Sequence, residues 1–200
     1  ITSGMLDPAF GGDSCVFRTM KRGNDTQGKM KVLLEPPITL SISANDPTNP
    51  ADYQIASKVK ELCKSKGIAP DEFILDATGV GRGVAAILQR EWSPRIEICT
   101  FGGSPSDRVI GDEFPVPANK EYDRFVTELW FAIRQFSEAD LLRGLDQPTA
   151  VQLCSRTYED KGVGGNRKLS IQKKDEMLHS PDEADALACG IELMRRKGVN

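Results

Sequence analysis

Residues 73–88 read FILDATGVGRGVAAIL, and this stretch decides the fold class of the chain. Residues 73–75 form a short apolar run typical of a buried strand, and Asp76 ends it. Three glycines within residues 79–83 predict a tight turn, and apolar side chains at helical spacing follow over residues 84–88. Because a connection longer than a hairpin implies parallel pairing, we expect this strand to run parallel to a neighbour.

The segments around this stretch predict a mixed α/β domain. A meander of antiparallel strands is indicated over residues 4–9, 14–22 and 30–40. The spacing of apolar residues predicts helices over 50–66, 121–136, 149–157 and from residue 180 on, with a strand over 95–101 and a loop over 102–119. The last helix opens with Ser180-Pro181-Asp182-Glu183, which has the pattern of a capping box. We therefore expect a mixed β-sheet of three antiparallel strands plus parallel strands, flanked by helices on both faces.

The composition is that of a globular protein. Of the 200 residues, 39% are hydrophobic and 28% are charged, which excludes a disordered or fibrous chain. No apolar run approaches the roughly 20 residues of a membrane span, so we expect no membrane partner. The net charge of −3 does not indicate a nucleic-acid binder, although local patches decide such contacts. Five separated cysteines and one histidine argue against a zinc site or a disulfide framework and fit a reducing compartment.

Four aspartates stand where chemistry could use them. Asp7 and Asp76 each end an apolar stretch, and Asp182 and Asp185 lie one turn apart on the last helix. If the two strands are neighbours, their aspartates converge beyond the carboxyl ends of the strands, where ligands gather in open α/β sheets. Clustered carboxylates favour hard divalent cations, Mg²⁺ or Mn²⁺, and two such ions serve phosphodiester cleavage. Taken alone, an aspartate at a strand end is more often a turn or cap residue than a ligand.

Basic residues precede the acidic segment. We expect a basic β-hairpin over residues 158–175, because five Lys and Arg and no acid fall between residues 161 and 174. Such side chains would contact a DNA backbone without reading its sequence. The candidates for DNA contact are Arg82, Arg167, Lys168, Lys173 and Lys174. A solvated hairpin explains any single lysine equally well.

Three motifs together resemble a known family. They read Leu6-Asp7-Pro-Ala-Phe-Gly-Gly-Asp13-Ser, Ile74-Leu-Asp76-Ala-Thr-Gly-Val-Gly81 and His179-Ser-Pro-Asp182-Glu-Ala-Asp185-Ala-Leu-Ala. With the segments 122–130 and 168–175 between them, the chain resembles the C-terminal nuclease domain of the large terminase subunit of tailed bacteriophages. The resemblance spans nearly the whole chain. The DxxDA ending alone is shared with other RNase H-like enzymes, Holliday-junction resolvases among them.

The resemblance implies an RNase H-like fold and a metal-dependent endonuclease. Such an enzyme cuts concatemers of double-stranded DNA, largely without sequence specificity, during the packaging of a viral genome. Asp7 and Asp76 match the first and second acids, and Asp182 or Asp185 matches the third, so these residues are expected to hold two Mg²⁺ or Mn²⁺ ions. Asp13 matches a further acid that some members use. Several relatives have Glu at the position of Asp76, and the shorter side chain bears on the spacing of the second ion.

The same resemblance implies the partners. They are double-stranded DNA and, in the full-length protein, an ATPase motor domain, the small terminase subunit and the capsid portal, in the host cytoplasm. The chain has no G-x-x-x-x-G-K-[ST] loop and opens on Ile1, so we expect one nuclease domain over residues 1–200 of a longer protein, without its motor. Gly79 and Gly81 are expected to form a turn beside Asp76 that lets a DNA backbone approach, and His179 is expected next to the site.

Two other functions stay open. A junction resolvase with an RNase H-like fold would prefer a four-way junction to linear duplex. A non-catalytic domain that binds DNA or the portal would retain duplex binding and show no metal-dependent cutting. Four acids at the expected positions favour the nuclease, because a binding domain has no need of converging carboxylates.

Overall fold

The computed structural model describes residues 1–111, 114–162 and 167–199. In this part of the chain, one sheet dominates the structure. Its strands are β1 (Thr2–Asp7), β2 (Cys15–Asn24), β3 (Met30–Leu34), β4 (Ile38–Leu40), β5 (Phe73–Asp76), β6 (Glu97–Cys99) and β9 (Leu142–Arg143).

The strand order of this sheet is β6-β5-β1-β2-β3-β9, with β4 paired to β2 off this path. β1, β2 and β3 pair in antiparallel fashion, whereas β5 runs parallel to β1 and β6 runs parallel to β5. The expected mixture of three antiparallel strands with parallel ones is therefore confirmed, and so is the parallel pairing of the strand that ends at Asp76.

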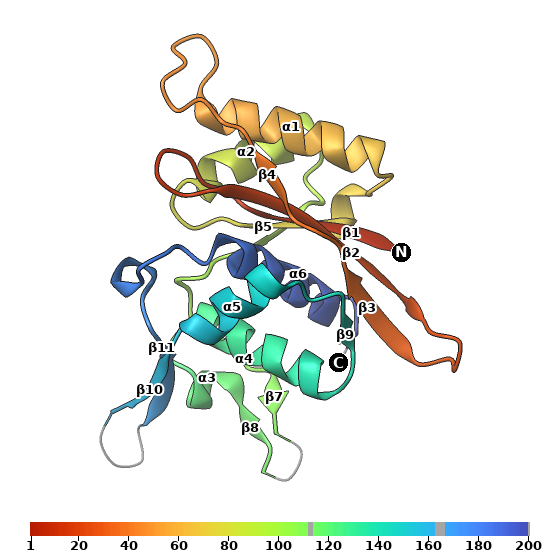
Figure 1. Ribbon diagram of the computed structural model, residues 1–200, viewed down its shortest axis with the longest axis vertical. Helices are drawn as coiled ribbons and strands as arrows, with labels where there is room; N and C mark the ends of the chain where they lie inside the picture. The colour runs from red at the N-terminus through yellow and green to blue at the C-terminus, as the bar shows by residue number, and fades with distance from the viewer. Residues whose placement is uncertain (112–113, 163–166, 200) are drawn as a thin grey trace.

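Helices cover both faces of the sheet, as expected (Figure 1). One face carries α1 (Ala51–Ser65) and α2 (Gly81–Glu91), which follow the antiparallel meander and β5. The other carries α4 (Phe125–Glu138), α5 (Gln147–Ser155) and α6 (Asp182–Arg196). Shorter helical turns are η1 (Pro70–Glu72), α3 (Ala118–Glu121) and η3 (Lys174–Glu176). No helix in the described residues is both long and apolar enough to cross a membrane.

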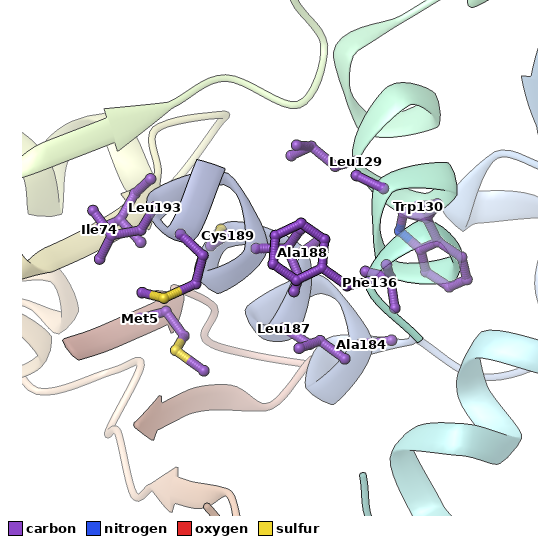
Figure 2. Close-up of a cluster of buried hydrophobic side chains, with 14 of the residues drawn as sticks. Met5, Ile74, Leu129, Trp130, Phe136, Ala184, Leu187, Ala188, Cys189 and Leu193 are labelled. Carbon is purple, nitrogen blue, oxygen red and sulfur yellow. The ribbon is translucent and has the colours of Figure 1, made fainter. Parts of the chain in front are cut away.

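Alternation along the strands divides the core into two clusters. Leu6 and Leu75 point to the α1–α2 face, whereas their neighbours Met5 and Ile74 point to the α6 face. Figure 2 shows α6 between the sheet and α4, with Leu187 and its neighbours surrounded by apolar side chains from both sides. Because α6 is buried along nearly its whole length, its first turn is held at a fixed place over the sheet.

Two helix starts differ from the sequence prediction. The helix expected from residue 121 begins at Phe125, because Tyr122 forms a bridge with Leu169 and the Asp123 N–H donates to the Leu169 carbonyl. The capping box predicted at Ser180 is wrong. α6 begins at Asp182, Pro181 precedes it without a side-chain cap, and the Ser180 hydroxyl donates to the Asp182 carboxylate instead.

Two small hairpins project from the body beside α3 (Figure 1). The first, β7 (Val109–Ile110) with β8 (Val116–Pro117), lies within the segment that the sequence predicted as loop only. The second, β10 (Tyr158–Lys161) with β11 (Lys168–Ile171), is the expected hairpin. Its strands end before Lys173, so the last two predicted basic residues lie outside it.

Candidate active site

Asp7 and Asp76 stand side by side because their strands do. β1 and β5 are parallel neighbours with Leu6 opposite Leu75, so both strands end at the same edge of the sheet with their final residues adjacent. Both aspartates are buried. The arrangement follows directly from the parallel pairing, which places carboxyl ends of neighbouring strands together.

The first turn of α6 supplies two more buried carboxylates, Asp182 and Asp185. α6 packs across β1, β2 and β5, which brings its N-terminus over the ends of the strands. The Ser14 N–H donates to Asp182 Oδ2 at 2.9 Å and ties the loop after β1 to this turn. The four aspartates named from the sequence are therefore brought to one place.

Lys174 lies in the middle of these carboxylates. Its ammonium nitrogen is within ion-pair distance of three of them, at 3.0 Å from Asp182 Oδ1, 3.4 Å from Asp185 Oδ2 and 3.6 Å from Asp7 Oδ2, and it also lies 3.8 Å from Asp13 Oδ2. The prediction that grouped Lys174 with the hairpin is wrong in its placement, because η3 turns this side chain inward from the end of β11. Burial opposes its charge, but the carboxylates around it outweigh burial and raise its pKa.

Asp7 is the acid of the site whose ionised form is disfavoured most strongly. Burial raises its pKa well above the ordinary value, and repulsion from Asp185, Asp182 and Asp76 raises it further against the opposing pull of Lys174. Its buried Oδ2 atom has no hydrogen-bond partner among the described residues. Its nearest cation, the Lys174 ammonium, is 3.6 Å away, and a buried carboxylate oxygen without a hydrogen bond is costly unless something else binds it. The missing hydrogen bond of this oxygen is therefore the clearest indication that the site binds a cation.

Asp76 is held from one side. Its Oδ1 accepts the Thr78 N–H at 3.0 Å, the Thr78 hydroxyl at 2.7 Å and the Phe101 N–H at 3.2 Å. Burial still raises the pKa of Asp76 despite these hydrogen bonds. Because Oδ1 is fully engaged, the carboxylate is fixed and Oδ2 is the atom left to face the other acids.

The two glycines after Asp76 shape the turn into α2. Gly79 has a φ of +55°, a region that costs other residues energy. A Cβ on Gly81 would lie 1.8 Å from the Asp76 carbonyl oxygen and 2.9 Å from a Pro8 side-chain carbon. The turn therefore packs against the end of β5 at Asp76 and against Pro8, which follows the end of β1 at Asp7, as the sequence suggested for a tight turn.

The donor set fits hard divalent cations in its chemistry. It consists of carboxylate oxygens without a histidine, and one of these oxygens accepts no hydrogen bond from the described residues. Across residues 1–111, 114–162 and 167–199, however, no three His, Cys, Asp or Glu side chains are grouped closely enough to hold a metal as they stand. The Lys174 ammonium already bridges three of the four aspartates. A cation would have to replace that ammonium.

The other predicted residues lie at the margins of the site. Asp13 is half exposed, and His179 is exposed. Arg82, in the first turn of α2, and Lys173 are exposed as well. In the hairpin, Arg167 pairs with Asp160 at 3.5 Å and Lys168 donates to the Asn119 carbonyl at 2.8 Å, so internal partners already bind part of the predicted basic surface.

Sequence reasoning missed several residues that build the site. Arg156, just after α5, is buried and lies 3.4 Å from Asp185 Oδ1, and no motif announces it. Ser180 and the Ser14 N–H both bind Asp182, which depends on tertiary contacts. Thr78 alone had a local signal, since aspartate accepts hydrogen bonds from the second residue after it in many turns.

Comparison with known proteins gives a match in structure only. No family model and no curated protein matches the sequence. The nuclease domain of the large terminase subunit gp2 of bacterial virus Sf6 superposes with a TM-score of 0.64 at 15% identity, over 95% of this chain and 87% of that one. A lysine-to-alanine mutant of the same domain, with manganese and beta-thujaplicinol, gives 0.67 at 15% identity and the same coverage. The large terminase nuclease from thermophilic phage G20c gives 0.57 at 14%, covering 96% and 81%.

These likenesses establish the fold. The chain has the RNase H-like architecture of phage large-terminase nuclease domains, a mixed sheet with helices on both faces, over most of its length. The resemblance seen in the sequence motifs is thus supported at the level of structure.

Proposed function

We propose that this chain is a divalent-metal-dependent endonuclease that cuts double-stranded DNA concatemers, largely without sequence specificity, during packaging of a viral genome. The observation that carries the proposal is the convergence of Asp7, Asp182 and Asp185 on one ammonium group, with Asp76 beside Asp7 at the end of the neighbouring parallel strand. The shared fold with terminase nucleases and the manganese in an Sf6 structure support it.

In this proposal the four aspartates hold two Mg²⁺ or Mn²⁺ ions. Ions so held activate the attacking water and stabilise the leaving oxygen of a phosphodiester. The protein contributes fixed, buried oxygens: Thr78 and the Phe101 N–H orient Asp76, and the Ser14 N–H orients Asp182. Lys174 keeps the acids together until cations arrive. Asp13, on the exposed loop after β1, is an additional ligand candidate.

The proposal extends to the surroundings of the enzyme. Its substrate is the DNA backbone, approached through Arg82, Lys173 and the β10–β11 hairpin. In the whole protein this nuclease domain works with an ATPase motor domain, a small terminase subunit and a capsid portal, in the cytoplasm of the host cell. The likeness to terminase nucleases supports these partners.

Plasmid nicking tests the function directly. The natural chain, Asp76→Asn and Asp107→Asn are incubated with supercoiled plasmid and Mg²⁺, Mn²⁺ or chelator. We expect nicking by the natural chain with a metal ion, loss in Asp76→Asn, and normal nicking in Asp107→Asn, whose carboxylate is exposed on a loop and forms no ion pair with Lys174. A folded natural chain that cuts with neither metal would contradict the proposal and favour a domain that only binds DNA or the portal. Preference for a four-way junction would favour a resolvase.

A further inference from the structure

Arg156 makes the second cationic contact of Asp185. Its Nη1 lies 3.4 Å from Asp185 Oδ1, whereas Lys174 reaches Oδ2 on the other side of the same carboxylate. Both side chains of the Arg156–Asp185 pair are only 4% exposed. Desolvation cancels much of the Coulomb attraction in a buried ion pair, so the pair adds little to the stability of the fold. Its main effect is to fix the relative positions of the two side chains.

Two further contacts lock the guanidinium in place. Arg156 Nε donates to the Gln172 carbonyl at 2.8 Å, and the guanidinium carbon lies 4.6 Å from the centroid of the Trp130 ring. The planar fork of arginine can serve such contacts at once, which an ammonium cannot. Arg156 therefore presents one N–H to Asp185 from a fixed position.

The helix that leads to Arg156 also braces the first turn of α6. From α5, the Thr149 hydroxyl contacts Glu183 Oε2 at 3.3 Å, and Gln152 Oε1 accepts the Ala184 N–H at 3.0 Å. Three successive residues of α6, Glu183, Ala184 and Asp185, are thus bound by residues 149, 152 and 156 in that order. This series fixes both the backbone and the side chain of the turn that carries two acids of the site.

Lys174 and Arg156 differ in what they can do next. Lys174 is 34% exposed, and in the described part of the chain its ammonium contacts only carboxylates, so a cation can displace it. Arg156 is buried and anchored by Gln172 and Trp130, so it stays where it is. After displacement of the ammonium, Asp185 Oδ1 would still face Arg156 and Oδ2 would be free to bind a metal.

We propose that Arg156 is a positioning residue that fixes Asp185 as a one-oxygen metal ligand and so sets the affinity of the site for divalent cations. The inference rests on the proposed function, since it assumes that the aspartates bind metal. It assigns to a residue outside the acidic motifs a role in metal binding without direct contact to the ion. Outer partners of metal ligands typically contribute about 10–100-fold to affinity.

Metal affinity of the chelator-stripped chain tests the proposal without recourse to activity. Isothermal titration with MnCl₂ compares the natural chain, Arg156→Met, Arg156→Lys and the control Arg124→Met. Arg124 likewise donates to a backbone carbonyl, that of Ile171 at the end of β11. In the described residues, however, the ion pair of Arg124 is with Asp123 and not with an aspartate of the site. We expect both Arg156 variants to bind Mn²⁺ about 10–100-fold more weakly than the control. Arg156→Lys keeps the charge and so guards against a variant that fails to fold.

Three results would overturn the proposal. Unchanged or tighter Mn²⁺ binding by Arg156→Met, in a protein that unfolds cooperatively, would show that the arginine merely opposes the cation. Full affinity in Arg156→Lys would show that charge alone matters. No Mn²⁺ binding by the natural chain would overturn the proposed function together with this inference, which distinguishes that failure from the first two.

Discussion

The Lys174 ammonium lies 3.0 Å from Asp182 Oδ1 and binds the carboxylates that a divalent cation would need. Replacing it in Lys174→Met leaves buried carboxylates without their shared counter-charge. Loss of one partner of a buried pair costs about 3–5 kcal/mol, and the partial exposure of Lys174 reduces the expected loss of metal-free stability to about 1–2 kcal/mol. Thermal unfolding in chelator measures this loss.

Lys174→Met also tests whether the Lys174 ammonium competes with a divalent cation for the carboxylates. Because the methionine no longer competes for the carboxylates, we expect Mn²⁺ to raise the unfolding midpoint of Lys174→Met more than that of the natural chain. Lys173→Met is the matched control, since Lys173 is exposed and contacts none of the four site aspartates in the described residues. An equal Mn²⁺ shift in Lys174→Met and Lys173→Met would contradict the competition.

Asp7→Asn is expected to stabilise the metal-free protein. The raised pKa of Asp7 means that burial and its neighbours disfavour the ionised form in the folded state. A neutral amide of the same shape removes that repulsion and can donate to the adjacent carboxylates, a gain of about 0.5–2 kcal/mol. Denaturant unfolding in chelator checks the gain, and plasmid nicking is expected to be lost. A less stable Asp7→Asn protein would show that the attraction to Lys174 outweighs the repulsion.

The glycine turn after Asp76 is expected to tolerate no side chain at Gly81. A Cβ there would overlap the Asp76 carbonyl oxygen, so Gly81→Ala must displace backbone beside the site, at a cost of about 1–3 kcal/mol or more. Gly102→Ala is the control, since a Cβ at Gly102 meets no atom within 4 Å. Urea unfolding compares the two variants. Equal stability would mean that the turn relaxes without cost.

The sequence predicted the positions of the acids well because they depend on local pattern. Apolar runs that end in Asp7 and Asp76 define strand ends, and parallel pairing then brings those ends together. The place of Lys174 among the acids, where the sequence predicted a DNA contact, and the whole role of Arg156 were missed, because both depend on where a turn and a helix pack. The predicted hairpin ran to residue 175, whereas its second strand ends at Ile171 and the chain then turns inward.

Binding of DNA is expected to depend on salt through a few free cations. Lys173 is exposed and has no ion-pair partner among the described residues, whereas Arg167 already faces Asp160. Lys173→Gln should therefore reduce the slope of log affinity against log salt by about one, and Arg167→Gln by less. Fluorescence anisotropy with a labelled duplex in chelator measures both slopes. Identical slopes for the natural chain and Lys173→Gln would remove Lys173 from the DNA contact.

The stability of the protein around β1 is expected to depend on pH through Glu72. Burial raises the pKa of this carboxyl, but hydrogen bonds from Arg22 at 2.6 Å and from the Ser3 hydroxyl at 2.6 Å outweigh burial and lower it to about 2. A folded pKa below the unfolded value of 4.5 means that this contribution is present above pH 4.5 and is lost as the pH falls toward 2. Glu72→Gln lacks the ionisable group. Its unfolding midpoint should therefore lie below that of the natural chain at pH 6 and approach it near pH 2. A constant difference between the two proteins from pH 6 to pH 2 would show that the ion pair of Glu72 with Arg22 adds nothing to the stability of β1 beside β5.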